Sequence, residues 1–330
     1  MEANSDRVVY FNGEFIPESQ ARISIYDSAL MFGDMVFEMT RSFNGVQFKL
    51  REHLERLYAS IKMVRIPVAM TIDEMEEACY QTIEANKPAF AADDEHRLMI
   101  DVSRGLLSLY EGNVKGVQTG PNVIIADFPL RWTVASMGPL FDKGINAVIP
   151  SQRAIPASLL DPKIKNRSRL FYLMANIEVG NCEGDNNWAL LLDPDGFVTE
   201  GTGDNFLIVK DGVIISPEGR NILRGVSRAY VMNELAPQLG LRAVERNIEP
   251  YDVLTADEAF MTATPFCILP VTSLNGSPIG HGVGQVTRML LNAWSENVGV
   301  DIPAQIKSWA VASARAVSQS PSPYSFKSSR

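Results

Sequence analysis

Three short segments of the chain carry residues that suit one kind of chemistry. Lys165 lies in the run DPKIKN (161–166), Glu200 begins the loop EGTGDN (200–205), and a glycine and a serine follow in LRGVSR (223–228). An amine can form a Schiff base with an aldehyde, a carboxylate can keep a pyridine nitrogen protonated, and a turn can present N–H groups to a phosphate. Together the three segments are typical of a site for pyridoxal 5'-phosphate.

Each segment taken singly also has a purely structural interpretation. Most lysines are solvated surface charges, and spacing cannot choose between Lys163 and Lys165, because alternate residues of an extended segment share a face. Glu200 could be a turn glutamate that faces water, and Ser227 could simply cap the helix that follows. The residues therefore indicate this chemistry only as a set.

As a set, the segments resemble the class IV, fold-type IV aminotransferases. That family contains the branched-chain and D-amino acid aminotransferases, the (R)-amine transaminases and aminodeoxychorismate lyase, and the resemblance runs from about Val9 to about Trp294. It implies pyridoxal 5'-phosphate as cofactor and chooses Lys165 as the catalytic lysine, because the family places its Schiff-base lysine in an Ile-Lys-Asn or Ile-Lys-Ser context. Such a lysine also moves a proton during the reaction. In the matching Glu-Gly-x-Gly-x-Asn loop, Glu200 would bind the pyridine nitrogen.

The phosphate group of the cofactor has its own predicted residues. The turn Gly225–Ser227 precedes an apolar-periodic stretch, so the amides of Val226 and Ser227 would lie at a helix N-terminus, where the dipole favours an anion. Arg56 and Thr264 match the phosphate-binding arginine and threonine of the family. From the residues alone, Arg56 is only a charge on an amphipathic helix, so its role rests on the resemblance.

The substrate pocket is predicted from the segment FGDMVFE (32–38), which resembles a family segment whose aromatic residue lines the pocket. A buried strand is the structural alternative, and both interpretations can hold together. No acid close in sequence pairs with Arg41 or Arg97, so either could bind a carboxylate with both arms of its guanidinium, unless it lies at the surface. The residues predicted to line the pocket are Phe37, Met39, Arg41, Arg97, Met99 and Pro265.

Two family patterns for holding the substrate are missing. D-amino acid aminotransferases bind the substrate carboxylate with a tyrosine, an arginine and a histidine, where this chain has Phe37, Leu109 and Glu111. The (R)-amine transaminases share the runs around Lys165 and Arg224 closely, yet their Phe-x-Glu strand motif is not matched. Neither resemblance therefore identifies the substrate.

The branched-chain pattern is also incomplete. Branched-chain enzymes place Tyr-x-Arg on a strand of the small domain, where this chain has RLM (97–99). They also offer successive amides from a Thr-Ala pair, whereas Thr264 is followed here by Pro265, which has no N–H to donate. The residue that binds the substrate carboxylate therefore stays open.

The leading interpretation is a ping-pong aminotransferase that moves an amino group from a hydrophobic, branched-chain-like amino acid to a 2-oxo acid. Four apolar residues expected near the pocket favour such a donor, namely Phe37, Met39, Leu98 and Leu107. An (R)-amine or D-amino acid donor is the second interpretation, and a lyase of the aminodeoxychorismate type, which eliminates pyruvate, is the third. A binding protein that has lost catalysis would not need the lysine and the glutamate.

The elements that must position these residues predict an α+β fold with two domains. Two Asn-Gly pairs between apolar runs predict β-hairpins, and a Thr-x-x-Glu capping box opens a helix at Thr71. The small α/β N-terminal domain is expected over 1–128, with hairpins at 8–16 and 39–48, helices at 51–64 and 71–86, and strands at 97–102 and 122–128.

A second domain is expected after a connection at 129–138 that carries turn residues and little periodicity. The resemblance implies a larger, β-rich pseudobarrel domain that binds the cofactor, over 139–312, and 313–330 is predicted to be a tail rich in Ser and Pro. Strands are expected at 197–200 and 205–209, and helices at 169–181, 227–239 and 286–297.

Composition favours small molecules as partners. With 46% hydrophobic and 21% charged residues in 330, the chain has the profile of a soluble globular protein, and a net charge of −9 with a pI near 5.0 argues against nucleic acid and acidic membranes. The first residues have no signal-peptide pattern and no apolar run reaches the length of a membrane span, so we expect a cytoplasmic protein. The resemblance implies a homodimer, with the loop at 105–112 reaching the active site of the neighbour.

Cysteine and histidine usage predicts no metal. Cys79, Cys182 and Cys267 have no CxxC or metal-ligand spacing and are expected to be packing residues. His53, His96 and His281 form no HExxH pattern.

Overall fold

The computed structural model describes residues 7–312, which divide into two compact units. Unit 1 consists of residues 7–132 together with 164–169, and the remaining described residues form unit 2. The short segment 164–169 carries Lys165, so the lysine belongs to the N-terminal unit, whereas the predicted domain boundaries assigned it to the large domain.

Unit 1 ends its main part at Trp132, inside the connection predicted over 129–138. The predicted tail over 313–330 lies outside the described residues.

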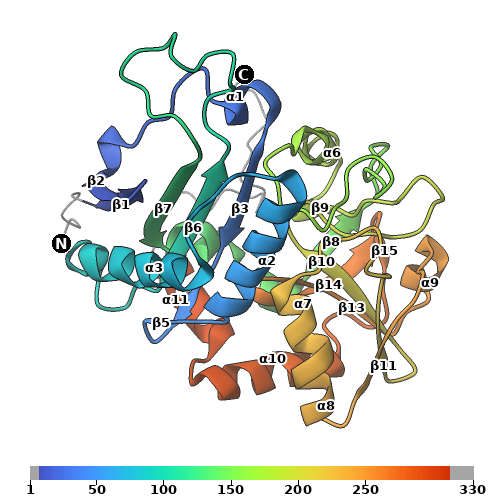
Figure 1. The fold of residues 1–330 in the computed structure, drawn as a ribbon. Coiled ribbons are helices and arrows are strands. Elements are labelled where there is room, and N and C mark those ends of the chain that lie inside the picture. The colour runs from blue at the N-terminus through green and yellow to red at the C-terminus, as the bar shows by residue number, and fades with distance from the viewer. Residues whose placement is uncertain (1–6, 313–330) are drawn as a thin grey trace, which may run out of the picture. The chain divides into compact units, whose positions relative to one another are not determined.

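Unit 1 is built on a five-stranded antiparallel sheet in the order β2-β1-β7-β6-β3 (Figure 1). The two predicted hairpins are confirmed, and the Asn and Gly at the tip of each have positive φ, as such tight turns require. The elements of unit 1 are β1 (Val8–Phe11), β2 (Glu14–Pro17), η1 (Glu18–Gln20), α1 (Ser28–Phe32), β3 (Met35–Met39), β4 (Ser42–Phe43), β5 (Val46–Gln47), α2 (Leu50–Val64), α3 (Ile72–Asn86), η2 (Lys87–Ala89), β6 (His96–Ser103) and β7 (Asn122–Pro129).

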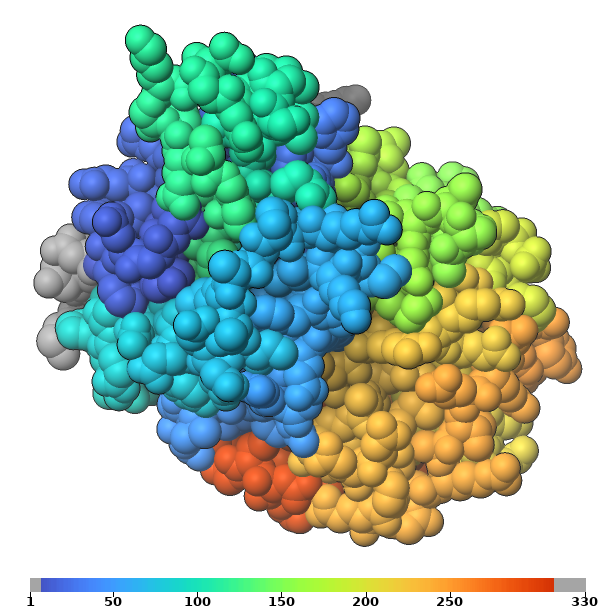
Figure 2. Space-filling model, viewed as in Figure 1, coloured from blue at the N-terminus to red at the C-terminus, as the bar shows by residue number. Residues whose placement is uncertain are grey.

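Helices α2 and α3 cover one face of this sheet, and their side chains form the near surface of unit 1 in Figure 2 (blue to cyan). The predicted capping box of α3 is confirmed, because Thr71 accepts from the amide of Glu74 while the Glu74 carboxylate accepts from the amide of Thr71. These two bonds satisfy N–H groups that the first turn of a helix leaves open.

The alternation of side chains along β6 and β3 divides the sheet into two faces. Leu98, Ile100 and Val102 of β6 and Val36 of β3 belong to the core that contains α2 and α3. The interpretation of Leu98 as a pocket residue is therefore wrong.

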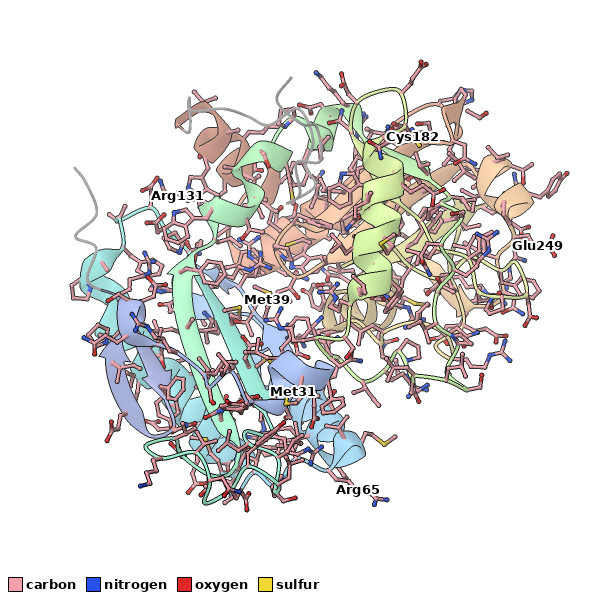
Figure 3. The ribbon with its side chains drawn as sticks, turned by 90° about the horizontal axis from the view of Figure 1, so that it is seen from above. Met31, Met39, Arg65, Arg131, Cys182 and Glu249 are labelled. Carbon is pink, nitrogen blue, oxygen red and sulfur yellow. The ribbon has the colours of Figure 1, made fainter. Side chains whose placement is uncertain are left out.

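The opposite face of the sheet is named the Phe37 face here. Phe37 pairs with Asp101 and Met39 with Met99 in the antiparallel register, and Arg97 lies two residues further along β6. Met39, labelled in Figure 3, is the last residue of β3. The Phe37 face thus consists of Phe37, Met39, Arg97, Met99 and Asp101.

Unit 2 is built on an eight-stranded mixed sheet in the order β12-β11-β10-β13-β14-β8-β9, with β15 paired to β14 (Figure 1). The strand predicted over 197–200 is wrong, since only isolated bridges form there. Helix α4 (Arg131–Val134) spans the boundary between the units along the chain; the elements of unit 2 are η3 (Ala135–Met137), α5 (Leu140–Lys143), β8 (Ile145–Val148), α6 (Leu170–Gly180), β9 (Asn187–Ala189), β10 (Asn205–Lys210), β11 (Val213–Ser216), α7 (Val226–Tyr230), η4 (Val231–Leu235), α8 (Ala236–Gln238), β12 (Arg242–Glu245), α9 (Pro250–Leu254), β13 (Glu258–Ala263), β14 (Cys267–Leu274), β15 (Ser277–Pro278), α10 (Gln285–Val298) and α11 (Ile302–Ala312).

The predicted helix at 227–239 is present but interrupted. Its first turn is α7, its middle is the π-helical turn η4, and it ends in α8. The π turn lies just before Pro237, which has no N–H for an i→i−4 bond. Within 7–312, no helix combines the length and the apolar character needed to cross a bilayer.

The cysteines only partly follow the prediction. Cys79 and Cys267 are buried, as expected of packing residues, but Cys182 is exposed, so that assignment is wrong for it. Among the described residues, no three His, Cys, Asp or Glu side chains gather as metal ligands would.

Candidate active site

Lys165 lies on a segment that runs beside β3 and extends the sheet of unit 1. The amide of Phe37 donates to the carbonyl of Lys165 at 2.9 Å, and the amide of Arg167 donates to the carbonyl of Met35 at 2.9 Å. The amide of Lys165 donates to Ser60 Oγ on α2 at 3.2 Å. Backbone bonds on both sides therefore fix the lysine next to Phe37.

Three cationic side chains surround the ring of Phe37. Lys165 Nζ lies 4.8 Å from the ring centroid, the guanidinium of Arg167 lies 3.7 Å from it, and that of Arg169 lies 5.6 Å from it. Arg167 also donates from Nε and Nη2 to one oxygen of Asp101, at 2.9 and 2.7 Å. Gathered positive charge of this kind attracts anionic ligands, which amino acids and 2-oxo acids are at their carboxylates.

Arg56 is held by a buried glutamate of β3. Glu38 is fully buried, and it accepts from Arg56 Nε at 2.6 Å and from Arg56 Nη2 at 2.8 Å. The His53 ring nitrogen Nδ1, one helical turn before Arg56, lies 2.8 Å from the second carboxylate oxygen. A bidentate guanidinium–carboxylate pair has a fixed geometry, so Arg56 is a positioned cation rather than a free surface charge.

The ionisation of this group follows from its contacts. Burial alone would raise the pKa of Glu38, but Arg56 and His53 together hold that pKa well below its ordinary value. Burial lowers the pKa of His53, although Glu38 opposes the shift. A neutral His53 donating from Nδ1 to an ionised Glu38 agrees with both pKa shifts.

Of the residues predicted for the substrate pocket, Pro265 lies in unit 2 and the others lie in unit 1. Phe37, Met39, Arg97 and Met99 share the Phe37 face. Arg41 lies just beyond β3 with its guanidinium 3.7 Å from the centroid of the Phe43 ring. Arg41 and Arg97 are both buried, so the surface alternative is wrong for each.

In unit 2, Glu200 is a buried hydrogen-bond acceptor. One carboxylate oxygen accepts from the Tyr172 hydroxyl at 2.8 Å, and the other accepts from Asn205 Nδ2 at 2.9 Å and from the amide of Leu223 at 3.0 Å. Only 5% of Glu200 is exposed, so the alternative of a turn glutamate facing water is wrong. Three donors orient the carboxylate and offset much of the cost of burying it.

The turn before α7 fits tightly against this acid. A Cβ at Gly225 would overlap Asn205 Oδ1, and Asn205 Nδ2 also donates to the carbonyl of Leu223 at 2.9 Å. The helix begins at Val226, one residue before its predicted start at Ser227. Gly225 is at the N-cap position and there is no side-chain cap, so capping by Ser227 is wrong. The first-turn amides have no earlier carbonyl of the helix to bind, which leaves them suited to an anion.

Arg228 connects the first turn of α7 to strands β11 and β12. It is buried, with Nε donating to Ser216 Oγ at 2.6 Å and Nη2 donating to the Glu245 carboxylate at 2.6 Å. The hydrogen bond from Arg228 lowers the pKa of Glu245, although burial opposes the shift. Thr264 and Pro265 lie in the half-buried turn between β13 and β14.

Comparison with known proteins identifies the family of this chain. The family model for amino-transferase class IV matches residues 35–274. The chain belongs to the class IV aminotransferases. A protein of Methanocaldococcus jannaschii described as a putative branched-chain-amino-acid aminotransferase is 36% identical over 285 residues, which cover 86% of this chain and 93% of that protein.

Solved structures of class IV aminotransferases have the same fold. The branched-chain amino acid aminotransferase of Escherichia coli superposes with a TM-score of 0.77 at 29% identity, covering 88% of this chain and 94% of that one. The enzyme of Thermobaculum terrenum, solved in its PLP form, gives 0.76 at 26% identity, covering 94% and 98%. The predicted α+β, two-domain fold of type IV is confirmed. So are the predicted enzyme class, a transaminase, and the family's cofactor, pyridoxal 5'-phosphate.

The side chains of each unit suit this cofactor. Unit 1 offers the amine of Lys165 and the oriented guanidinium of Arg56. Unit 2 offers the carboxylate of Glu200 and a helix start at Val226 whose preceding glycine leaves room that a side chain would fill. An amine, an acid and two anion-binding groups are the donor set that a phosphorylated pyridine aldehyde needs.

Four residues of this class IV aminotransferase were missed as contributors to the site. Glu38 and Asn205 stand inside the quoted motifs, yet nothing in the sequence pairs them with Arg56 or Glu200. A glutamate in the otherwise apolar strand MVFEM is a signal that could have been used, since a buried acid needs a partner. His53 and Tyr172 carry no comparable signal.

Proposed function

We propose that this aminotransferase takes an amino group from a hydrophobic, branched-chain-like amino acid and passes it to a 2-oxo acid by a ping-pong mechanism. The observation that carries the proposal is the Phe37 face, where apolar side chains lie next to cations: Phe37 and the two methionines for an aliphatic side chain, Lys165 and Arg167 for charged groups. The branched-chain names of the relatives support the same donor class.

The proposed roles of the residues follow their chemistry. When bound, pyridoxal 5'-phosphate supplies an aldehyde and an electron-accepting ring. Lys165 would bind that aldehyde through Nζ and then carry the proton that leaves the α-carbon of the donor. Glu200 would keep the ring nitrogen protonated, with Asn205 orienting its carboxylate.

Each unit, taken by itself, offers groups that suit a phosphate. Arg56 supplies the guanidinium that Glu38 orients. The turn of Gly225, Val226 and Ser227 supplies first-turn amides, and Thr264 supplies a hydroxyl.

A donor screen tests this function. The purified, cofactor-loaded enzyme is mixed separately with L-leucine, D-alanine and (R)-1-phenylethylamine, and the visible absorbance of the bound cofactor is followed. We expect L-leucine to bleach the band and a 2-oxo acid to restore it. If no donor bleaches it, the proposed function fails.

The residue after Thr264 is the reason why the screen includes other classes of donor. Pro265 has no N–H, so the amide pair that branched-chain enzymes offer is incomplete. Faster bleaching by (R)-1-phenylethylamine or D-alanine would favour the (R)-amine or D-amino acid alternative. Release of pyruvate without a 2-oxo acid acceptor would favour the lyase.

We also propose that the active form is a homodimer. The exposed fractions of Leu30 and Phe32, both in helix α1, are 62% and 67%. Those of Ile25 and Leu109 are 74% and 64%. Tyr26 and Tyr110, next to two of these residues, have ring centroids 5.0 Å apart, so the apolar groups share one region of unit 1. Large apolar side chains gathered at a surface are typical of an interface. Sedimentation and activity measured together on dilution test this, and a fully active monomer would contradict it.

A further inference from the structure

We propose that Ser60 of helix α2 is a positioning residue, whose hydroxyl holds the main chain of Lys165 at a fixed distance from that of Arg56. The inference rests on the proposed roles of these two residues, the lysine as the group that binds the cofactor aldehyde and the arginine as a cation for the phosphate. Ser60 lies outside the motifs from which the site was predicted.

The hydroxyl of Ser60 makes one hydrogen bond in each direction. It donates to the carbonyl of Arg56, one helical turn earlier, at 3.0 Å, and it accepts from the amide of Lys165 at 3.2 Å. A serine hydroxyl has one proton to donate and two lone pairs, so the bond to the Arg56 carbonyl leaves the oxygen to accept from the lysine amide. The main chains of two predicted cofactor residues are therefore joined through a single side chain.

The helix itself gives no reason for a serine at this position. Ser60 is 2% exposed and lies between Leu57 and Ile61, which belong to the apolar core of unit 1. Alanine favours a helix more than serine does, and a hydroxyl that bonds back to the carbonyl four residues earlier slightly destabilises the helix. The bond to the Lys165 amide offsets this cost, because it satisfies a main-chain donor.

The segment that carries Lys165 is held from two sides. On one side, the amide of Phe37 in β3 donates to the Lys165 carbonyl at 2.9 Å. On the other side, Ile164 packs against the core that contains α2, and Ser60 binds the lysine amide. A fixed main chain is needed because the side chain of a lysine is long and flexible, so the place of its amine depends on where the chain holds it.

Electrostatics connect the lysine amine with the same helix. Burial lowers the pKa of His53 on α2, and the charges of Arg56 and Lys165 lower it further, although Glu38 opposes the shift. A cofactor that carries its aldehyde and its phosphate on one ring needs the amine and the cation at a set spacing. An error of roughly 1 Å in such a spacing can cost about 100-fold in rate. Ser60 lies where it can set that spacing.

Ser295 of α10 provides a matched control. Its hydroxyl donates to the carbonyl of Leu291 at 2.9 Å and accepts from the amide of Ile302, the first residue of α11, at 3.2 Å. The hydrogen-bond pattern is that of Ser60, but it joins two helices of unit 2. Ser295→Ala therefore removes an equivalent pair of bonds without changing any residue proposed to bind the cofactor.

The test measures the affinity of the apoenzymes for two forms of the cofactor. Pyridoxal 5'-phosphate has the aldehyde that the lysine binds, whereas pyridoxamine 5'-phosphate has the same ring and phosphate but no aldehyde. Equilibrium dialysis of the wild type, Ser60→Ala, Ser60→Thr and Ser295→Ala against each form gives the dissociation constants. A serine kept for stability alone would not distinguish the two forms.

We expect Ser60→Ala to weaken binding of pyridoxal 5'-phosphate roughly 10-fold and to leave binding of pyridoxamine 5'-phosphate unchanged, because only the aldehyde form depends on where the amine lies. Ser60→Thr, which keeps a hydroxyl, and Ser295→Ala should retain the wild-type constants. Equal weakening of both forms by Ser60→Ala, or no weakening of either, overturns the proposal. So does a threonine variant that has the wild-type thermal midpoint and yet binds the two forms as the alanine variant does.

Hydrogen exchange of the apoenzyme tests the contact without the cofactor. The amides of residues 164–169, followed by mass spectrometry, should exchange roughly 10-fold faster in Ser60→Ala than in the wild type, and Ser295→Ala should leave them unchanged. Wild-type exchange in Ser60→Ala would show that the hydroxyl does not hold this segment, and would overturn the proposal.

The Lys165→Ala variant separates an error about Ser60 from an error about the lysine. If Lys165→Ala keeps the visible band of the bound cofactor, the lysine is misassigned and the role of Ser60 fails with it. If Lys165→Ala loses the band and Ser60→Ala binds both forms as the wild type does, only the role of Ser60 fails. If Ser60→Ala discriminates between the two forms as expected but no donor bleaches the band, the proposed function fails while the role of Ser60 stands.

Discussion

At the scale of single residues, Glu38 connects several parts of the site. It is fully buried, binds Arg56 through two nitrogens and His53 through one, and stands next to Phe37 in β3. Because its pKa is held below the ordinary value, the stability it contributes is present above about pH 4.5 and is lost as the pH falls further. The glutamate orients the guanidinium of Arg56, the cation proposed to bind the cofactor phosphate, and at the same time stabilises unit 1.

Replacing Glu38 with glutamine should therefore weaken both stability and cofactor binding. We expect the free energy of unfolding to fall by roughly 3 kcal/mol, because a buried guanidinium loses its charged partner. Urea unfolding of the apoenzyme and equilibrium dialysis of the cofactor measure the two effects. Glu55→Gln, on the exposed side of the same helix as Arg56, is the control and should change neither. A Glu38→Gln enzyme with wild-type stability would contradict this role.

The choice between two neighbouring lysines gives a second prediction at this scale. Lys165→Ala should abolish the visible band of the bound cofactor and transamination, because the amine that binds the aldehyde is lost. Lys163→Ala should keep both, since Lys163 pairs with Asp161 at 2.7 Å and donates to the carbonyl of Arg220. Absorbance spectra of the two variants with added cofactor decide it, and the opposite pattern would show that the lysine is misassigned.

At the scale of elements, the turn before α7 holds together Glu200 and the first-turn amides that are proposed to bind the phosphate. Asn205, the first residue of β10, donates to Glu200 and to the carbonyl of Leu223. The strand start and the helix start are thus joined by one amide side chain, and Gly225 is the residue that lets them approach.

Gly225→Ala should therefore reduce cofactor affinity roughly 10-fold or more, because the added methyl group displaces Asn205 and removes a donor from Glu200. Gly219→Ala, in the same loop, is the matched control, since the nearest atoms to a Cβ there lie at ordinary contact distance. Cofactor titration of both apoenzymes measures the difference. Equal affinities would show that the turn tolerates a side chain.

At the scale of the whole molecule, the dependence of stability on pH is set by buried acids. Asp127 of β7 is buried, with one oxygen 2.8 Å from His96 Nδ1 and the other without a hydrogen-bond partner in the described chain. Burial raises the pKa of Asp127 to about 6, although His96 and Arg7 oppose the shift. Its contribution to stability is present below the ordinary pKa of 3.8 and is lost as the pH rises through 6.

Asp127→Asn should remove this dependence. The stability of the variant relative to the wild type should grow between pH 4 and pH 7, by up to about 3 kcal/mol. Thermal midpoints across that range measure it, and Asp93→Asn, at an exposed acid paired with Arg131, is the control. A difference that stays constant with pH would contradict the buried state of Asp127. The expected cytoplasmic location stays a prediction.

Local features of this fold were predictable from the sequence because short-range interactions decide them. The hairpin turns at Asn12 and Asn44 need positive φ, and the helix at Thr71 needs its capping box. The helix predicted from Ser227 begins one residue earlier, at Val226. The predicted strand at 197–200 failed for the opposite reason, since strand pairing depends on distant partners.

The sequence by itself determined the family and the cofactor chemistry, because motifs with fixed spacing specify them. The reactive residues that it names stay a prediction. Only the tertiary structure decided which charges are buried and which groups they contact: Glu38 with Arg56, Asn205 with Glu200, and Arg97 with no strong acceptor among residues 7–312. Such partners come from separate segments of the chain, and the free energy of a charge depends on the atoms around it rather than on its neighbours in sequence.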